Sequence, residues 1–340
     1  MSRMHWTGVL DGDSESSDDR TRRGTAHAQM TLLSLRSALR WLAMLRYSSR
    51  SGTLRIETLT LRLTKLSECH CVEVSVVAAR TLDLLDDLVA HGRAAITTAE
   101  AADALAIPPE QVRVRMHRYV QQGRVIAPAR GLWVPVPPQD RVYGSLPGLE
   151  MIDLLMGHLG RDYYVGWLSA AEVHGAAHQA PQALQVAVSA PVQDRTFGRV
   201  RLQFAIRTRV AEVPREQRIA PTGRFWVATP ATTALDLVDD PDRSGGLSNA
   251  ATVIAELAED GKLTDDALAD AAGHFAITTV RRLGWLLDIL DLTALTSGLE
   301  RLAAEHRQAP ITTLDRHSAP DGPVDQRWRV AVNTEIDPDL

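Results

Sequence analysis

The sequence has few of the residues that mark secreted, metal-binding or membrane proteins. Cys69 and Cys71 are the only cysteines among 340 residues. A Cys-x-Cys pair gives no disulfide framework, and without a second pair it lacks the spacing of a zinc site. No apolar run approaches the length of a membrane span, and residues 1–19 have a polar, acidic middle where a secretion signal needs an apolar core. These absences predict a cytoplasmic protein without a bound metal or cofactor.

Lysine is almost absent as well. Lys65 and Lys262 are the only two, so arginine supplies nearly all the positive charge, and the net charge is -5. Any surface that binds nucleic acid must therefore be a local gathering of arginines and not a general excess of base. Length and a hydrophobic content of 45% are sufficient for two domains with separate cores.

Residues 1–76 differ from the rest. Residues 11–19 are acidic and rich in serine, which predicts a solvated segment. Residues 31–47 have the spacing of an amphipathic helix and residues 53–64 alternate like a strand, but neither has clear caps. Two explanations stay open: a flexible extension, or upstream sequence included by a start codon assigned too early.

Residues 77–139 predict a winged helix-turn-helix that binds DNA. Leu82, Leu85 and Val89 have helical spacing, and Thr97 with Glu100 forms a capping box before a short helix at 101–105. Pro109 suits the first position of a third helix because the amide it lacks would be unpaired there.

The third helix, predicted at 110–122, has one apolar face and one basic face. Its apolar residues Val112, Met116, Tyr119 and Val120 share one side. Two β-rich arms follow, at 124–128 and 132–136, around a turn that carries Arg130. The alternative is a helical module that binds protein; a basic helix face and an arginine at the hairpin tip favour DNA. The predicted DNA-binding residues are Arg113, Val114, Arg115, His117, Arg118, Gln121 and Arg130.

Residues 143–340 predict a larger α+β domain with an antiparallel or mixed sheet. The alternation of apolar and polar residues predicts strands, and helical periodicity predicts helices between them. The expected strands are 163–165, 183–188, 200–206, 225–228 and 327–333. The expected helices are 149–159, 168–174, 231–238, 249–259, 265–273, 278–289 and 299–305.

Several polar residues have spacings that resemble those of metal-binding, catalytic or phosphate-binding sites. His174 and His178 have the four-residue spacing of zinc ligands, but Gly175 interrupts the helix and no third ligand is evident, which favours packing or hydrogen bonding. Residues 259–262 resemble a nuclease carboxylate–lysine set, but they lie on a glycine turn and predict a surface turn. A second basic patch has two readings, phosphate or partner binding, or a solvated sheet edge; it comprises Arg207, Arg209, Arg215 and Arg218.

Five stretches in order resemble the AbiEi antitoxin family, over about residues 80–340. The first is Tyr164–Gln179, which reads YVGWLSAAEVHGAAHQ. The others are Thr229–Val238, Gly245–Leu247, Arg281–Leu287 and Arg327–Val330 followed by Asn333.

The resemblance implies an antitoxin of a type IV toxin–antitoxin, or abortive-infection, system. Such proteins bind repeats in their own promoter through an N-terminal winged helix, and their partner gene encodes a nucleotidyltransferase-like toxin. It therefore implies a transcriptional repressor in phage defence, not an enzyme, with promoter DNA, a toxin and a second copy on DNA as partners. One departure is Ile107-Pro108-Pro109, where such turns often have glycine and a Ser or Thr cap. Two alternatives are a nuclease delivered by its winged helix and a transcriptional regulator without an antitoxin role.

Overall fold

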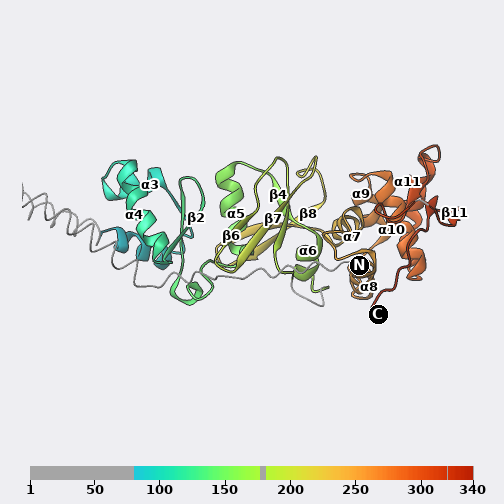
Figure 1. The fold of residues 1–340 in the computed structure, drawn as a ribbon, viewed down its shortest axis with the longest axis horizontal. Helices are drawn as coiled ribbons and strands as arrows, with labels where there is room; N and C mark the ends of the chain where they lie inside the picture. The colour runs from blue at the N-terminus through green and yellow to red at the C-terminus, as the bar shows by residue number, and fades with distance from the viewer. Residues whose placement is uncertain (1–79, 177–180, 320, 340) are drawn as a thin grey trace, which may run out of the picture. The chain divides into compact units, whose positions relative to one another are not determined.

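The structure is a computed structural model that describes residues 80–176, 181–319 and 321–339, and it has a mixed α+β fold (Figure 1). The predictions for residues 1–76, including Cys69 and Cys71, and for His178 lie outside these residues. From Ser75 to Leu340 the chain forms one compact unit. Residues 80–139 are called the N-terminal region below, and residues 143–339 the C-terminal region.

The N-terminal region consists of helices and a small three-stranded sheet. Residues 80–90 are helical. The sheet has the order β1-β3-β2, and both of its pairings are antiparallel. The elements that follow the first helix are β1 (Ile96–Thr97), α3 (Thr98–Leu105), α4 (Pro109–Gln121), β2 (Val125–Ala129) and β3 (Leu132–Pro135).

Helix α3 begins at Thr98, three residues before the predicted start at residue 101, and α4 begins at Pro109, one residue before the predicted start at residue 110. The Thr97 hydroxyl accepts a hydrogen bond from the Glu100 amide at 3.2 Å, and the Glu100 carboxylate accepts one from the Thr97 amide at 2.7 Å, which confirms the capping box. The prediction for the first helix was wrong in one position: Leu88 is buried there, whereas Val89 is 40% exposed. Leu85 and Leu88, three residues apart, therefore form the inward face.

A six-stranded mixed sheet forms the centre of the C-terminal region. Its order is β6-β7-β5-β4-β9-β8, with β5–β7 and β4–β9 parallel and the other pairs antiparallel. The sequence did not predict β6 and β8, which occupy the two edges. The strands are β4 (Tyr163–Val165), β5 (Leu184–Val188), β6 (Arg195–Phe197), β7 (Val200–Ile206), β8 (Arg215–Ala220) and β9 (Gly223–Ala228).

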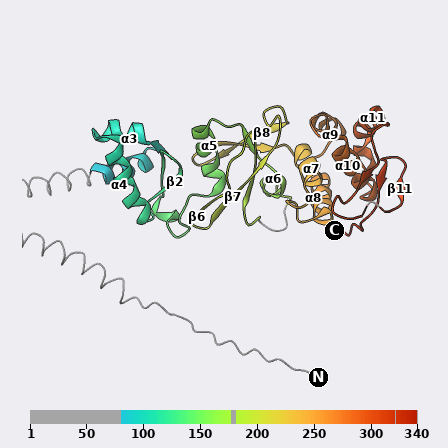
Figure 2. The same ribbon diagram turned by 45° about the horizontal axis from the view of Figure 1, so that its top comes forward.

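Helix α5 precedes the first strand of this sheet in the sequence and α6 follows β4, and helices α7 to α11 form a separate group that stays together in both views (Figures 1 and 2). The helices from residue 138 onward are η2 (Pro138–Asp140), α5 (Gly148–Leu159), α6 (Trp167–Val173), α7 (Pro230–Asp239), α8 (Leu247–Glu259), α9 (Asp265–Ala272), α10 (Ile277–Ile289), η3 (Thr293–Leu295) and α11 (Ser297–Glu305).

A small sheet near the C-terminal end has the order β10-β12-β11, with β10 (Thr312–Thr313), β11 (Val324–Asp325) and β12 (Val330–Ala331). The prediction of a strand over 327–333 was too long. Arg329 has a φ of +54°, which is incompatible with an extended strand, so the strand begins only at Val330.

The hairpin β2–β3 contributes to two hydrophobic clusters. Val125 and Trp133 belong to the cluster of the N-terminal region, with Met116 of α4. Ile126 and Val134 belong instead to the large cluster of the C-terminal region. Because neighbouring residues in a strand point to opposite faces, the hairpin is covered on both sides.

Candidate nucleic-acid interface

Helix α4 has the two faces that the sequence predicts. Val112 and Met116 are fully buried and Tyr119 is 7% exposed, so these three face the core. Pro109 occupies its first turn, and the Pro108 carbonyl accepts hydrogen bonds from the amides of Gln111 and Val112 at 3.0 and 3.2 Å. The opposite side is open to solvent; its exposed residues are Arg113, Val114, His117, Arg118 and Gln121.

The turn before α4 is closed by an alanine in an unusual conformation. Ala106 ends α3 with φ 52° and ψ 45°, the left-handed region in which glycine and asparagine are favoured. Its amide still donates to the carbonyls of Ala102 and Asp103. The sequence has neither a glycine nor a side-chain cap at this turn, and these backbone hydrogen bonds stabilise the turn instead.

The β2–β3 hairpin is fixed on α3 and lies next to α4. Trp133 Nε1 donates to the Thr98 hydroxyl at 2.9 Å, and the Thr98 amide donates to the Gly131 carbonyl at 2.8 Å. Gly131 has φ +83°, which allows the tight turn beside Arg130. His158 Nε2 of α5 lies 3.1 Å from the Arg130 carbonyl. The backbone of Arg130 is thus held while its side chain stays exposed.

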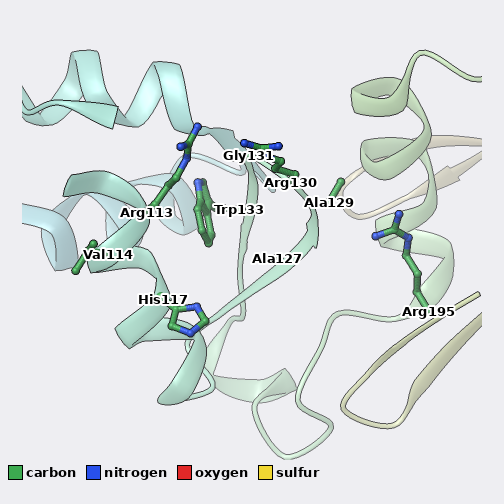
Figure 3. A pocket seen from close by; sticks show the side chains of 9 residues that line it. All are labelled: Arg113, Val114, His117, Ala127, Ala129, Arg130, Gly131, Trp133 and Arg195. Atoms are coloured by element: carbon green, nitrogen blue, oxygen red, sulfur yellow. The ribbon is translucent and has the colours of Figure 1, made fainter. Parts of the chain in front are cut away.

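A pocket of about 640 Å³ lies between α4 and the hairpin (Figure 3). Four of the seven predicted DNA-binding residues line it, namely Arg113, Val114, His117 and Arg130. The other lining residues are Ala127, Ala129, Gly131, Trp133 and Arg195, so the lining holds three arginines and no carboxylate. The structure therefore brings the helix and the hairpin tip together around one positive surface.

Arg195 was missed because the sequence did not predict β6. Its Nη1 donates to the Pro128 carbonyl of β2, and its buried Nε has no hydrogen-bond partner in the part of the chain that the structure describes. Only the pairing of β6 with β7 carries this side chain to the hairpin, and no local pattern of residues signals it.

Three predicted residues lie outside the pocket. Arg118 and Gln121 are exposed on α4, one and four residues beyond His117. Arg115 is half-buried, and its Nε is buried without a partner among the described residues. These residues widen the exposed polar face of α4 toward its C-terminal end.

Arg207, one of the four arginines of the predicted second basic patch, is largely buried. Arg207 Nη2 lies 2.6 Å from Asp236 Oδ1 and 3.1 Å from Asp239 Oδ2, and its side chain is 11% exposed. Its guanidinium also lies 4.3 Å from the centroid of the Phe275 ring. The sequence grouped this arginine with a surface cluster, whereas the fold places it against a buried carboxylate.

Of the other three arginines of that cluster, Arg215 is largely buried, whereas Arg209 and Arg218 are exposed. Arg215 donates to the Tyr163 carbonyl at 2.7 Å, and its guanidinium carbon lies 4.4 Å from the centroid of the Trp226 ring. Arg218 pairs with Glu216 at 2.7 Å, and Arg209 lies 4.0 Å from Glu212. Arg215 and Arg218 belong to the edge strand β8, where charged side chains discourage pairing with another strand. Both readings of the patch, a solvated edge and a surface for phosphate or a partner, stay predictions.

Asp236 is a fully buried titratable group of the C-terminal region. Its side chain is 0% exposed, and Oδ1 accepts a hydrogen bond from the Tyr164 hydroxyl at 3.2 Å. Burial raises the pKa of the Asp236 carboxyl to about 7, although the charge of Arg207 acts in the opposite direction. Burial likewise raises the pKa of the Tyr164 hydroxyl. Tyr164, Arg207 and Asp236 therefore form a polar centre that ties β4 and the end of β7 to α7.

The histidine of the zinc-like spacing has a structural role, as predicted. His174 is buried, and its Nε2 lies 2.7 Å from the Ala228 carbonyl. Burial lowers the pKa of its imidazole. Lys262 follows the glycine turn after α8 and donates to the His174 carbonyl and to Asp260, both at 2.5 Å.

Within the described ranges, no three His, Cys, Asp or Glu side chains gather closely enough to hold a metal ion. None of the helices described is both long and apolar enough to cross a membrane.

Comparison with known proteins supports the resemblance seen in the motifs. Residues 164–289 match the family model of the AbiEi antitoxin C-terminal domain. The fold is similar to the crystal structure of the RV2827C protein from Mycobacterium tuberculosis, with a TM-score of 0.53 and 14% identity, over 75% of this chain and 90% of that chain. No curated protein sequence matches the chain. The resemblance to the AbiEi antitoxins is therefore confirmed over residues 164–289, and it supports an antitoxin role.

Proposed function

We propose that the chain is a DNA-binding antitoxin of a type IV toxin–antitoxin system, which represses its own promoter and counteracts a nucleotidyltransferase-like toxin. The observation that carries the DNA-binding part is the pocket between α4 and the hairpin. Arg113, His117 and Arg130 meet there with Arg195, and the lining includes no carboxylate. Such a surface matches the phosphate backbone that dominates the affinity of proteins for DNA.

Residues 77–139 are proposed to act as a winged helix-turn-helix. The helix at 80–90 and α3 support α4, whose open face enters the major groove. The hairpin is the wing, and Arg130 at its tip reaches a neighbouring phosphate. In this arrangement Val114, His117, Arg118 and Gln121 face base edges, while the arginines beside them position the helix.

Residues 143–340 are proposed to counter the toxin, because the match to the AbiEi antitoxin domain lies within them. The toxin is expected to be a nucleotidyltransferase-like protein encoded beside this chain. Two copies of the antitoxin are expected on the inverted repeats of the promoter, since paired half-sites mirror the symmetry of a dimer. The antitoxin controls the toxin either through direct contact or through the level of toxin expression. A toxin co-expression assay on variants that no longer repress the promoter separates these two routes.

The first test measures binding of the full chain to its promoter DNA at several salt concentrations. We expect affinity to fall steeply as salt rises, because neutralised phosphates release their counterions. Salt-independent binding, or no preference for promoter DNA over unrelated DNA, would contradict the proposal.

A second test separates the alternatives. The chain is incubated with plasmid DNA and Mg²⁺ or Mn²⁺; cleavage that a carboxylate substitution abolishes would identify a nuclease instead. Repression of a promoter reporter without any protection in a toxin co-expression assay would identify a plain transcriptional regulator.

A further inference from the structure

A second arginine-rich pocket lies far along the chain from α4, in the last part of the C-terminal region. Its volume is about 270 Å³, and it is lined by α10, the end of α11 and the segment before β12. Four guanidinium groups share it with one carboxylate. The lining residues are Arg281, Glu300, Ala303, Ala304, Arg307, Gln326, Arg327, Trp328 and Arg329.

Two of these arginines have structural partners. Arg281, 1% exposed, donates to the carbonyls of Pro310 and His306 at 2.7 and 2.9 Å and so fixes the chain that follows α11. Arg327 pairs with Asp288 at 2.7 Å and with Glu300 at 3.0 Å. The one carboxylate of the lining, Glu300, is therefore already engaged.

The other two arginines keep donors unused. Arg329 Nε is buried and has no hydrogen-bond partner within the described part of the chain; its Nη2 makes one long contact, 3.4 Å, to the Ala309 carbonyl. Arg307 is exposed in the turn after α11, and the structure gives it no ion pair with any described residue. A buried donor without an acceptor destabilises a protein, so such a group calls for an explanation.

The segment that carries Arg327 and Arg329 is held rigidly in place. Trp328 between them is fully buried, and its Nε1 donates to Asp288 Oδ2 at 2.6 Å. A Cβ atom on Gly284 of α10 would collide with the Trp328 ring, so only glycine permits this approach. Arg329 adopts a φ of +54°, a conformation that L-residues other than Asn and Asp rarely accept. Strain of this kind persists where surrounding contacts over-determine it, and it concentrates at binding sites.

Positive charge in the pocket exceeds negative charge. Burial and the nearby charge of Arg329 lower the pKa of the Arg281 guanidinium, and Glu300 is the one carboxylate among the residues that line the pocket. Guanidinium groups in a fixed arrangement match phosphate and carboxylate oxygens through paired hydrogen bonds. A doubly charged phosphate compensates this excess better than a single carboxylate does.

We propose that this pocket is a binding site for a phosphate group, held by Arg307 and Arg329 with Arg281 and Arg327 behind them. Pockets for drug-sized ligands span about 300–1,000 Å³, so the smaller volume here selects a compact group. The phosphate is either free inorganic phosphate or the terminal phosphate of a nucleotide. Both sources supply the same oxygens, and the experiment distinguishes them.

The experiment measures binding of inorganic phosphate and of a nucleoside triphosphate to the full chain by calorimetry, with ionic strength held constant by chloride. Arg307→Gln removes an exposed charge and leaves the core untouched. Arg329→Asn removes the buried donor but keeps a residue type that tolerates the left-handed backbone. Arg301→Gln is the matched control, because Arg301 is exposed on the same helix α11 and does not line the pocket.

We expect the wild type and Arg301→Gln to bind phosphate equally, and each pocket variant to show a Kd about tenfold higher, as loss of a charge-assisted hydrogen bond predicts. Tighter binding of the triphosphate through the same two arginines identifies a nucleotide as the ligand; equal Kd values identify phosphate alone. Absence of phosphate binding by the wild type, or an equal Kd in all three variants, overturns the proposal.

Discussion

The guanidinium of Arg207 and the carboxyl group of Asp236 meet at 2.6 Å in the interior of the C-terminal region, from positions that the sequence separates by 29 residues. Arg207 follows β7 and Asp236 lies on α7, so this ion pair joins the sheet to the helices behind it. Tyr164 donates its hydroxyl to the same carboxyl oxygen.

Removal of Arg207 should therefore destabilise the fold. We expect Arg207→Ala to lower the free energy of unfolding by about 3–5 kcal/mol at mildly alkaline pH, because it leaves a buried carboxylate without its partner. The loss should be smaller at acid pH, where the Asp236 carboxyl is protonated. Denaturant titrations at both pH values measure it. Arg218→Ala on the exposed edge strand is the control and should have little effect.

Asp236 also predicts a pH dependence of stability. Its pKa is raised from 3.8 to about 7 in the folded state, so between these values the folded chain binds more protons than the unfolded chain. The free energy of unfolding contributed by this group is thus fully present below pH 4 and is lost as the pH rises toward 7. Asp236→Asn should remove this slope. A wild-type and variant profile that stay parallel from pH 4 to 7 would show that Asp236 does not titrate in this range.

The left-handed alanine before α4 predicts a stabilising substitution. Ala106→Gly should raise the free energy of unfolding by about 1 kcal/mol, since the left-handed conformation penalises a Cβ atom by about 1–2 kcal/mol while glycine gives back part of this in the unfolded chain. Thermal unfolding of the two proteins measures the difference. Ala104→Gly, within α3, is the control and should destabilise instead. A lower melting temperature for Ala106→Gly would mean that the turn has a different conformation.

The DNA-binding proposal distinguishes phosphate contacts from base contacts. Arg130→Ala at the hairpin tip should weaken binding to all DNA sequences alike and reduce the slope of log K against log salt by about one. Arg118→Ala on the open face of α4 should reduce the binding free energy for promoter DNA by about 1–3 kcal/mol, through the loss of contact with one base pair. The affinity for unrelated DNA should stay the same. Binding titrations on promoter and scrambled DNA test both. Identical behaviour of the two variants would argue against a recognition helix flanked by a wing.

The two proposed tasks should separate in cells. Arg118→Ala combined with Arg130→Ala should abolish repression while protection from the toxin survives, because both side chains are exposed and the stability change should stay within about half a kcal/mol. A promoter reporter and a toxin co-expression assay on the same variants test this. If the folded double variant fails to protect, the toxin is controlled through DNA binding, that is, through its expression level.

Local pattern was sufficient to predict the two faces of α4 and the central strands, but it placed Val89 instead of Leu88 on the inward face of the first helix. Val112 and Met116 recur at helical spacing and are fully buried, and strands β5 and β7 lie where alternation predicts them. The edge strands β6 and β8 escaped because β6 is three residues long and β8 is mostly polar, so neither has an apolar stripe. Arg207 escaped for another reason: its partner Asp236 is distant in the sequence, and only the fold shows that the pair is buried.

Because the hairpin is covered on both faces, the proposed DNA-binding region cannot readily be exchanged as a unit. A graft of residues 77–139 onto another protein would expose Ile126, Val134 and Val136, which now pack in the cluster of the C-terminal region. The proposed DNA-binding region is therefore not expected to work as an independent module, and recombination at residue 140 would yield a fragment with exposed apolar side chains. If the proposal holds, new operator preferences are expected to arise through substitutions on the open face of α4, one side chain at a time.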